Sequence, residues 1–128
     1  MKIKTLVCNC RGLNPAFEDV DTNTLPFQIE SELDVDYALV HPELCGPGGR
    51  AILEDVLRSA EDDPDTYVLV GACAVEAQRK VFKEPFRATD FNEAQFVPVD
   101  ISGTSNEGIL GRLRERAEAL AKSKKTHH

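Results

Sequence analysis

Four cysteines are the residues whose type and spacing point to chemistry in this 128-residue sequence: Cys8, Cys10, Cys45 and Cys73. Each of them stands close to the end of a short apolar run, and the first two are separated by a single residue. A lone cysteine is often a small buried hydrophobe, so one such position would indicate packing only. Four cysteines in comparable places favour a shared site for a metal or for thiol chemistry.

The apolar runs and the stretches between them predict the elements that must position these cysteines. Four short runs are typical of strands: residues 3–7, 37–40, 67–70 and 96–99. Four amphipathic stretches predict helices: residues 27–33, 52–60, 75–82 and 106–121. Residues 83–94 are expected to form a loop, and Pro98 suits an edge strand because proline cannot donate to a ladder. This alternation predicts an α/β fold with an open, mainly parallel four-stranded sheet and flanking helices, a Rossmann-like three-layer arrangement.

Length and composition fit one domain, which we expect to cover residues 1–121, followed by a polar tail at residues 122–128. The net charge of −7 disfavours nucleic acid as a partner, because binding to phosphates needs clustered Lys and Arg. Membrane insertion is not expected, because no apolar run approaches the roughly 20 residues that span a bilayer. Arg11 follows the first apolar run too soon for a signal peptide, so we expect a cytoplasmic protein. In that compartment, cysteines more often serve metal or redox chemistry than structural disulfides.

The predicted sheet brings the cysteines together. The carboxyl ends of parallel strands lie along one edge, and ligands bind in the crevice outside that edge. Four soft thiolates from separate loops suit an iron–sulfur cluster. We therefore expect Cys8, Cys10, Cys45 and Cys73 to ligate such a cluster, of the 4Fe–4S type, with 2Fe–2S or zinc as alternatives. Zinc is the weaker of these, since zinc sites usually contain paired C-x2–4-C segments.

Glycines accompany two of the cysteines. Gly46, Gly48 and Gly49 lie between Cys45 and a predicted helix, and Gly71 stands just before Cys73. We expect these four glycines to let the backbone approach the cofactor and donate N–H groups to anionic sulfur. A rival interpretation is a dinucleotide site, because Gly46, Gly48 and Ala51 fit the G-x-G-x-x-A pattern. The acidic residue that should end the following strand is absent, however, and Cys73 stands there instead.

Other interpretations of the cysteines stay open. Cys73, at the predicted start of a helix, is a candidate nucleophile for persulfide or disulfide-exchange chemistry. Cys8 and Cys10 are a conceivable dithiol, although the C-x-x-C motif of thioredoxins is absent. A zinc-stabilised or metal-free interaction module is a third hypothesis, and His41 is a candidate additional ligand.

Three segments of the chain resemble the N-terminal domain of the A-type component of heterodisulfide reductase, an iron–sulfur protein family. They are Val7-Cys8-Asn9-Cys10-Arg11-Gly12-Leu13-Asn14, Leu44-Cys45-Gly46-Pro47-Gly48, and Val68-Leu69-Val70-Gly71-Ala72-Cys73 with Phe82 beyond. The resemblance covers roughly residues 3–100. It implies an iron–sulfur module that transfers electrons in a heterodisulfide-reductase-like complex, in which the redox partners are flavin or iron–sulfur subunits. The delta subunit of hydrogenase complexes is a related resemblance, since it also places cysteines along a small α/β domain that holds a cluster.

Overall fold

The computed structural model describes residues 1–8 and 20–126. Four strands in these residues form one sheet. The strands are β1 (Lys2–Cys8), β2 (Tyr37–His41), β3 (Thr66–Ala72) and β4 (Phe96–Asp100). They lie in the order β2-β1-β3-β4, and every neighbouring pair is parallel. The predicted open parallel sheet of four strands is therefore confirmed.

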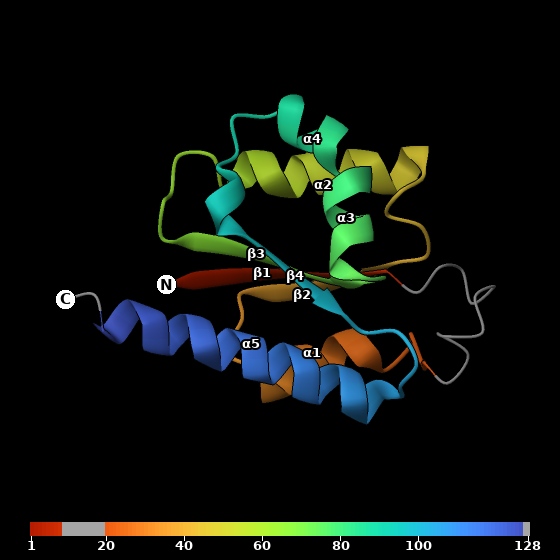
Figure 1. Ribbon diagram of the computed structural model, residues 1–128. Coiled ribbons are helices and arrows are strands. Elements are labelled where there is room, and N and C mark those ends of the chain that lie inside the picture. Colours follow the sequence, from red (N-terminus) through yellow and green to blue (C-terminus); the bar gives the residue numbers. More distant parts are fainter. Residues whose placement is uncertain (9–19, 127–128) are drawn as a thin grey trace.

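Helices cover both faces of this sheet. In chain order they are α1 (Leu25–Glu32), α2 (Pro47–Ser59), α3 (Val75–Val81), α4 (Lys83–Arg87) and α5 (Asn106–Thr126). Figure 1 shows α1 and α5 on one face of the sheet and α2, α3 and α4 on the other, so the molecule has three layers. The last helix continues past the expected boundary at residue 121, into the segment expected to be a polar tail.

The predicted loop at residues 83–94 is wrong in part, because α4 and a 3₁₀ helix at Glu93–Gln95 lie within it. Aromatic packing explains the difference. The buried Phe86 ring contacts Phe96 of β4 edge-on, with 5.0 Å between the ring centroids, and it stacks on Phe91. Pro85 is compatible with a first helical turn, where no intrahelical N–H bond is lost.

Alternate residues of β1 pack into two separate cores. Ile3 and Val7 belong to the core under α1 and α5, whereas Leu6 and Cys8 belong to the core under α2, α3 and α4. Side chains of successive strand residues point to opposite faces, so a strand covered on both faces needs apolar residues at nearly every position. This requirement explains why the strands appear in the sequence as continuous apolar runs.

On each of the two edge strands, a side chain from a neighbouring helix hydrogen-bonds to a backbone group of the strand. On β2, the Ala38 N–H donates to Oε1 of Glu30 at 3.0 Å. On β4, Nη1 of Arg112 donates to the Asp100 carbonyl at 3.0 Å, and Pro98 supplies no N–H. The expectation that Pro98 lies in an edge strand is confirmed. Covered edges of this kind oppose pairing with a strand of another chain.

Helix α2 approaches the turn that precedes it so closely that Gly49 is required. A Cβ atom at this position would overlap the carbonyl oxygen of Glu43 and the Cα atom of Leu44. Both of these are backbone atoms, so no side-chain rotation can relieve the overlap. The turn that carries Cys45 is therefore held against the first turn of α2 by the absence of a side chain at Gly49.

We predict that Gly49→Ala lowers the free energy of unfolding by about 2–3 kcal/mol or more, because the backbone must shift to admit the methyl group. Gly111→Ala is the matched control, since Gly111 is also helical and nothing lies within 4 Å of its added Cβ. That control is expected to stabilise the protein by about 0.5–1 kcal/mol. Urea denaturation followed by circular dichroism measures both, and equal effects of the two changes would contradict the close approach of α2.

Candidate functional site

The carboxyl ends of the four strands place chemically capable residues in one row. Cys8 ends β1 and is the register partner of His41, which ends β2. Cys73 follows β3, whose last residue Ala72 is paired with Asp100 at the end of β4. The chain leaves β1 toward β2 on one side and returns to β3 on the other. Ligands of open parallel sheets bind at such a switch point, and Cys8 and Cys73 stand on its two sides.

Cys8 is tied to the turn between β2 and α2. Its side chain is buried, with 6% of its surface exposed. The sulfur accepts the backbone N–H of Leu44, with 3.4 Å between nitrogen and sulfur, and the thiol faces the Pro42 carbonyl at 3.9 Å. Because Leu44 adjoins Cys45, these contacts bring the turn with the second thiol against the end of β1.

Cys45 is the exposed thiol of the site. It directly precedes Gly46, the N-cap of α2, whose N–H donates to the Glu43 carbonyl at 3.1 Å. Cys45 also lines a small cavity of about 90 Å³, beside Arg50 and Phe82. Its position at the surface differs from that of Cys8 and does not fit a purely structural buried thiol.

Cys73 is half-buried and electrostatically linked to the other thiols. Burial is the main cause that raises the pKa of the Cys73 thiol, and its own backbone N–H lowers the pKa in part. Negative charge on Cys8, on Cys45 and on Asp100 raises the pKa further. Cys8 and Cys45 therefore both lie within electrostatic reach of Cys73.

The structure describes three of the four predicted ligands. Cys10 lies outside the described residues. Within residues 1–8 and 20–126, no group of three or more His, Cys, Asp or Glu side chains could hold a metal ion. The ligation expected from the sequence stays a prediction, and His41 stays a candidate: its Nδ1 accepts the Glu43 N–H at 2.9 Å.

The four glycines expected to approach a cofactor occupy two kinds of place. Gly46 and Gly48 stand at the start of α2 beside Cys45, and the nearest atom to an added Cβ at Gly48 is Nε2 of His41, at 3.9 Å. Gly49 is required by the turn before α2. An added Cβ at Gly71 would meet Ile101 at 3.1 Å, in the core under α5 and on the face opposite to Cys8. Packing thus accounts for Gly49 and Gly71, while a role of the four toward a cofactor stays a prediction.

Two polar residues near Cys73 were not singled out from the sequence. Asp100 accepts hydrogen bonds from the backbone N–H and the hydroxyl of Ser102, which are the main reason that its pKa is lowered. The strand-end rule that located the cysteines also applies to Asp100 and would have found it. Gln78 is fully buried and donates to the Cys73 carbonyl at 2.8 Å. A glutamine within a short polar helix carries no such signal.

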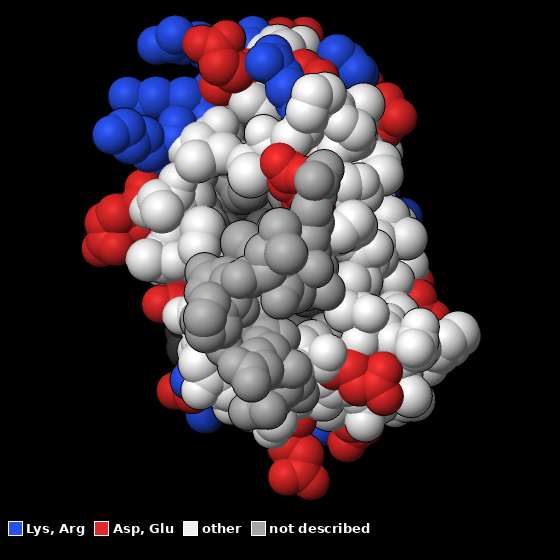
Figure 2. Space-filling model, turned by 90° about the vertical axis from the view of Figure 1, so that its right-hand side faces the viewer, with Lys and Arg blue, Asp and Glu red and all other residues white. Residues whose placement is uncertain are grey.

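The surface at this edge of the sheet is shown in Figure 2, which looks at the molecule from the side where residues 9–19 are drawn in grey. Charged side chains lie mainly toward the margin of this face, and Lys and Arg gather at one corner of it. The described atoms next to the grey ones are mostly uncharged. Apart from an acidic side chain at the upper border of the grey residues, the described surface next to them therefore carries little charge.

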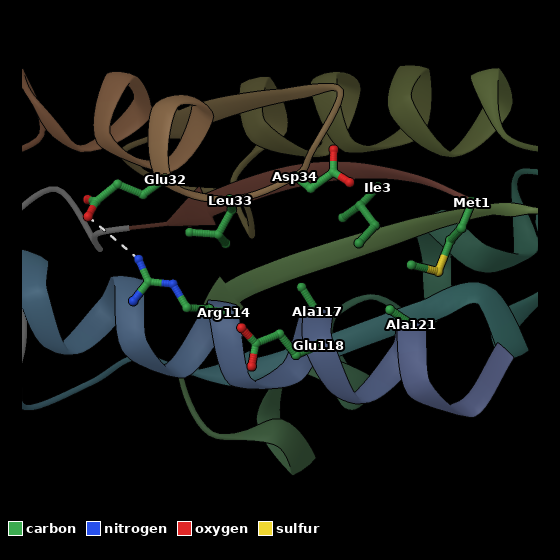
Figure 3. Close-up of a pocket in the computed structure, with 9 residues that line it drawn as sticks. All are labelled: Met1, Ile3, Glu32, Leu33, Asp34, Arg114, Ala117, Glu118 and Ala121. Atoms are coloured by element: carbon green, nitrogen blue, oxygen red, sulfur yellow. Dashed lines mark ion pairs between the residues drawn. The ribbon is translucent and has the colours of Figure 1, made fainter. Parts of the chain in front are cut away.

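A separate cavity of about 270 Å³ lies at the opposite, amino edge of the sheet. Figure 3 shows Ile3, Leu33 and Ala117 directed toward this space, with an ion pair between Glu32 and Arg114 at one end. The nitrogen and oxygen atoms of that pair are 3.5 Å apart. Ile3 stands near the start of β1 and Cys8 at its end, so this cavity is not part of the cysteine site.

Comparisons with known proteins add no identification. No protein-family model matches the chain, and no curated protein matches it. Among the residues that the structure describes, no helix is both long enough and apolar enough to cross a membrane. The resemblance to the heterodisulfide reductase family accordingly stays a prediction.

We predict that alkylation of Cys73 in the metal-free protein has its pH midpoint above the value of about 8.5 that is ordinary for cysteine, because the thiolate reacts and the pKa is raised. Asp100→Asn should move the midpoint down, since it removes a negative charge that opposes the thiolate. Asp62→Asn, an exposed change before β3, should leave it in place. Mass spectrometry of the Cys73 peptide across pH gives the midpoints, and a Cys73 midpoint below the ordinary value would refute the raised pKa.

Proposed function

We propose that the chain binds an iron–sulfur cluster through Cys8, Cys10, Cys45 and Cys73 and transfers electrons as a component of a larger redox complex. The observation that carries this proposal is the placement of three thiols from separate segments at the carboxyl edge of a parallel sheet, with Cys8 and Cys45 within electrostatic reach of Cys73. When bound, a cluster accepts and donates single electrons. The chain then acts as an electron-transfer component rather than as a stand-alone catalyst.

The donor set suits such a group. Thiolates are the ligands that iron–sulfur clusters require, and N–H groups aimed at sulfur help to set their reduction potential. The Leu44 N–H already points at the Cys8 sulfur. Further N–H groups without an intrahelical partner stand in the first turn of α2, at Gly48 and Gly49. A 4Fe–4S cluster is our first choice, and 2Fe–2S or zinc remain the alternatives.

Electrostatics gives a second argument. Negative charge on Cys8 and on Cys45 repels the Cys73 thiolate and raises the pKa of that thiol, in addition to the larger effect of burial. Without a cation, the Cys73 thiol therefore loses its proton less readily than an ordinary cysteine does. A metal centre supplies the positive charge that offsets this repulsion and takes the place of the protons.

The alternative of thiol catalysis fits the site less well. A nucleophilic cysteine needs a lowered pKa, whereas the pKa of Cys73 is raised, mainly by burial.

The mostly uncharged face around the site supports the approach of another protein, and we propose flavin or iron–sulfur subunits of a heterodisulfide-reductase-like complex for this role (Figure 2). A cytoplasmic location belongs to the same proposal.

We predict that anaerobic reconstitution with iron and sulfide gives a coloured protein, and that Cys→Ser at any of the four positions lowers the bound iron by more than about half, because each ligand is required. Val81→Thr is the control, since Val81 lines the cavity beside Cys45 and supplies no metal ligand. Iron and acid-labile sulfide are measured for each variant. Full iron content in Cys45→Ser, or zinc bound by the wild type in place of iron, would rule out the proposed cluster.

We predict that Asp100→Asn raises the reduction potential of the loaded protein by an amount on the order of tens of millivolts, because a nearby negative charge opposes the added electron. Asp34→Asn is the control, since Asp34 lies at the amino edge of the sheet. Potentiometric titration followed by electron paramagnetic resonance measures the two shifts. Equal shifts in both variants would show that Asp100 is not close to the redox centre.

A further inference from the structure

Helix α3, which begins just after Cys73, packs on the rest of the protein through an unusual buried residue. Its one buried residue is Gln78, with no exposed surface, while Arg79 and Lys80 next to it are exposed. Glutamine is seldom fully buried, because its amide must then find partners inside the protein. The polar contacts of Gln78 therefore need an explanation.

The amide of Gln78 is oriented by two carbonyl groups. Its Nε2 donates to the carbonyl oxygen of Cys73 at 2.8 Å and to that of Val99 at 3.0 Å. Carbonyl oxygens only accept, so the nitrogen must face them and Oε1 must face away. Within the described part of the chain, the buried Oε1 accepts no hydrogen bond. An unmatched buried acceptor destabilises the fold, so the reason for a glutamine here lies in what Nε2 holds.

We propose that Gln78 is a positioning residue that fixes Cys73 at the carboxyl edge of the sheet. β3 ends at Ala72 and α3 begins at Val75, so Cys73 lies in the short link between them. Gln78 fastens the carbonyl of this link to Val99 of the neighbouring strand β4, which restricts the backbone from which the Cys73 thiol projects. The Gln78 amide then acts together with the Ile101 N–H, which donates to the Ala72 carbonyl at 3.0 Å, to set the place of Cys73 relative to the other thiols.

The same chain contains a matched comparison at the other end of β3. Gln95 is also buried, at 5% exposure, and its Nε2 donates to the carbonyl of Asp63 at 2.8 Å and to that of Thr66. Thr66 is the first residue of β3, whereas Cys73 follows the last. Replacement of either glutamine by methionine removes one amide that bridges two carbonyl groups. The two variants differ in their distance from the thiols.

The experiment compares Gln78→Met, Gln95→Met and the wild type, each purified without metal. Iodoacetamide alkylation is followed by mass spectrometry at one pH, and the rate at Cys73 is divided by the rate at Cys45 in the same molecule. We expect both variants to lose stability in urea and only Gln78→Met to raise this ratio, by roughly tenfold or more. Gln78→Asn, which keeps the amide on a shorter side chain, should fall between Gln78→Met and the wild type, and it replaces Gln78→Met if that variant does not fold.

An unchanged ratio in Gln78→Met, or an equal rise in Gln95→Met, would overturn the positioning role and leave Gln78 as an ordinary stabilising residue. A metal arm deepens the proposed function and rests on it: in iron-loaded protein, Gln78→Met should change the paramagnetic resonance spectrum and Gln95→Met should not. The two failures are distinguishable. A wild type that binds no iron overturns the cluster while the alkylation ratio still tests Gln78, and a spectrum insensitive to Gln78→Met overturns its effect on the ligand Cys73.

Discussion

Strand β1 is hydrogen-bonded to a parallel neighbour on each side, and this double pairing constrains the rest of the molecule. Parallel neighbours need long crossover connections, and those on the two sides of β1 cover opposite faces of the sheet. Leu6 and Val7 are therefore fully buried in two different cores. The same parallel arrangement aligns all four carboxyl ends at one edge. The location of Cys8 beside the segments that carry Cys45 and Cys73 follows from how β1 is paired.

Much of this fold could be predicted from the sequence, because a strand buried on both faces must be apolar throughout. The four runs, the parallel sheet and the edge position of Pro98 follow from that requirement. The strand order could not be predicted, since the runs are alike in character and their pairing depends on which face each helix covers. Helix α4 was not predicted, because a long-range contact stabilises it: Phe86 of this helix packs on Phe96 of a later strand.

For the candidate site, the edge of the sheet at which it lies could be predicted, but its geometry could not. Strand ends locate Cys8, Cys45 and Cys73, but they do not give burial, so the difference between buried Cys8 and exposed Cys45 needed the structure. Proximity to Cys73 in sequence does not give the packing role of Gly71, whose missing side chain makes room for Ile101 on the other face. The hydrogen bond of Gln78 to Val99 joins a helix to the following strand, and no local sequence pattern predicts it.

The buried-thiol and metal-centre interpretations make different demands on the same three residues. Buried structural thiols should all be enclosed, and Cys8, with its place in the apolar core, meets this demand. Cys45 does not, since it is exposed and precedes the first turn of α2. Cys73 is half-buried, yet its pKa responds to the charges of both other thiols. Packing gives no reason for Cys8 and Cys45, of such unequal burial, both to lie within electrostatic reach of Cys73, whereas a shared cation requires closeness and tolerates unequal burial.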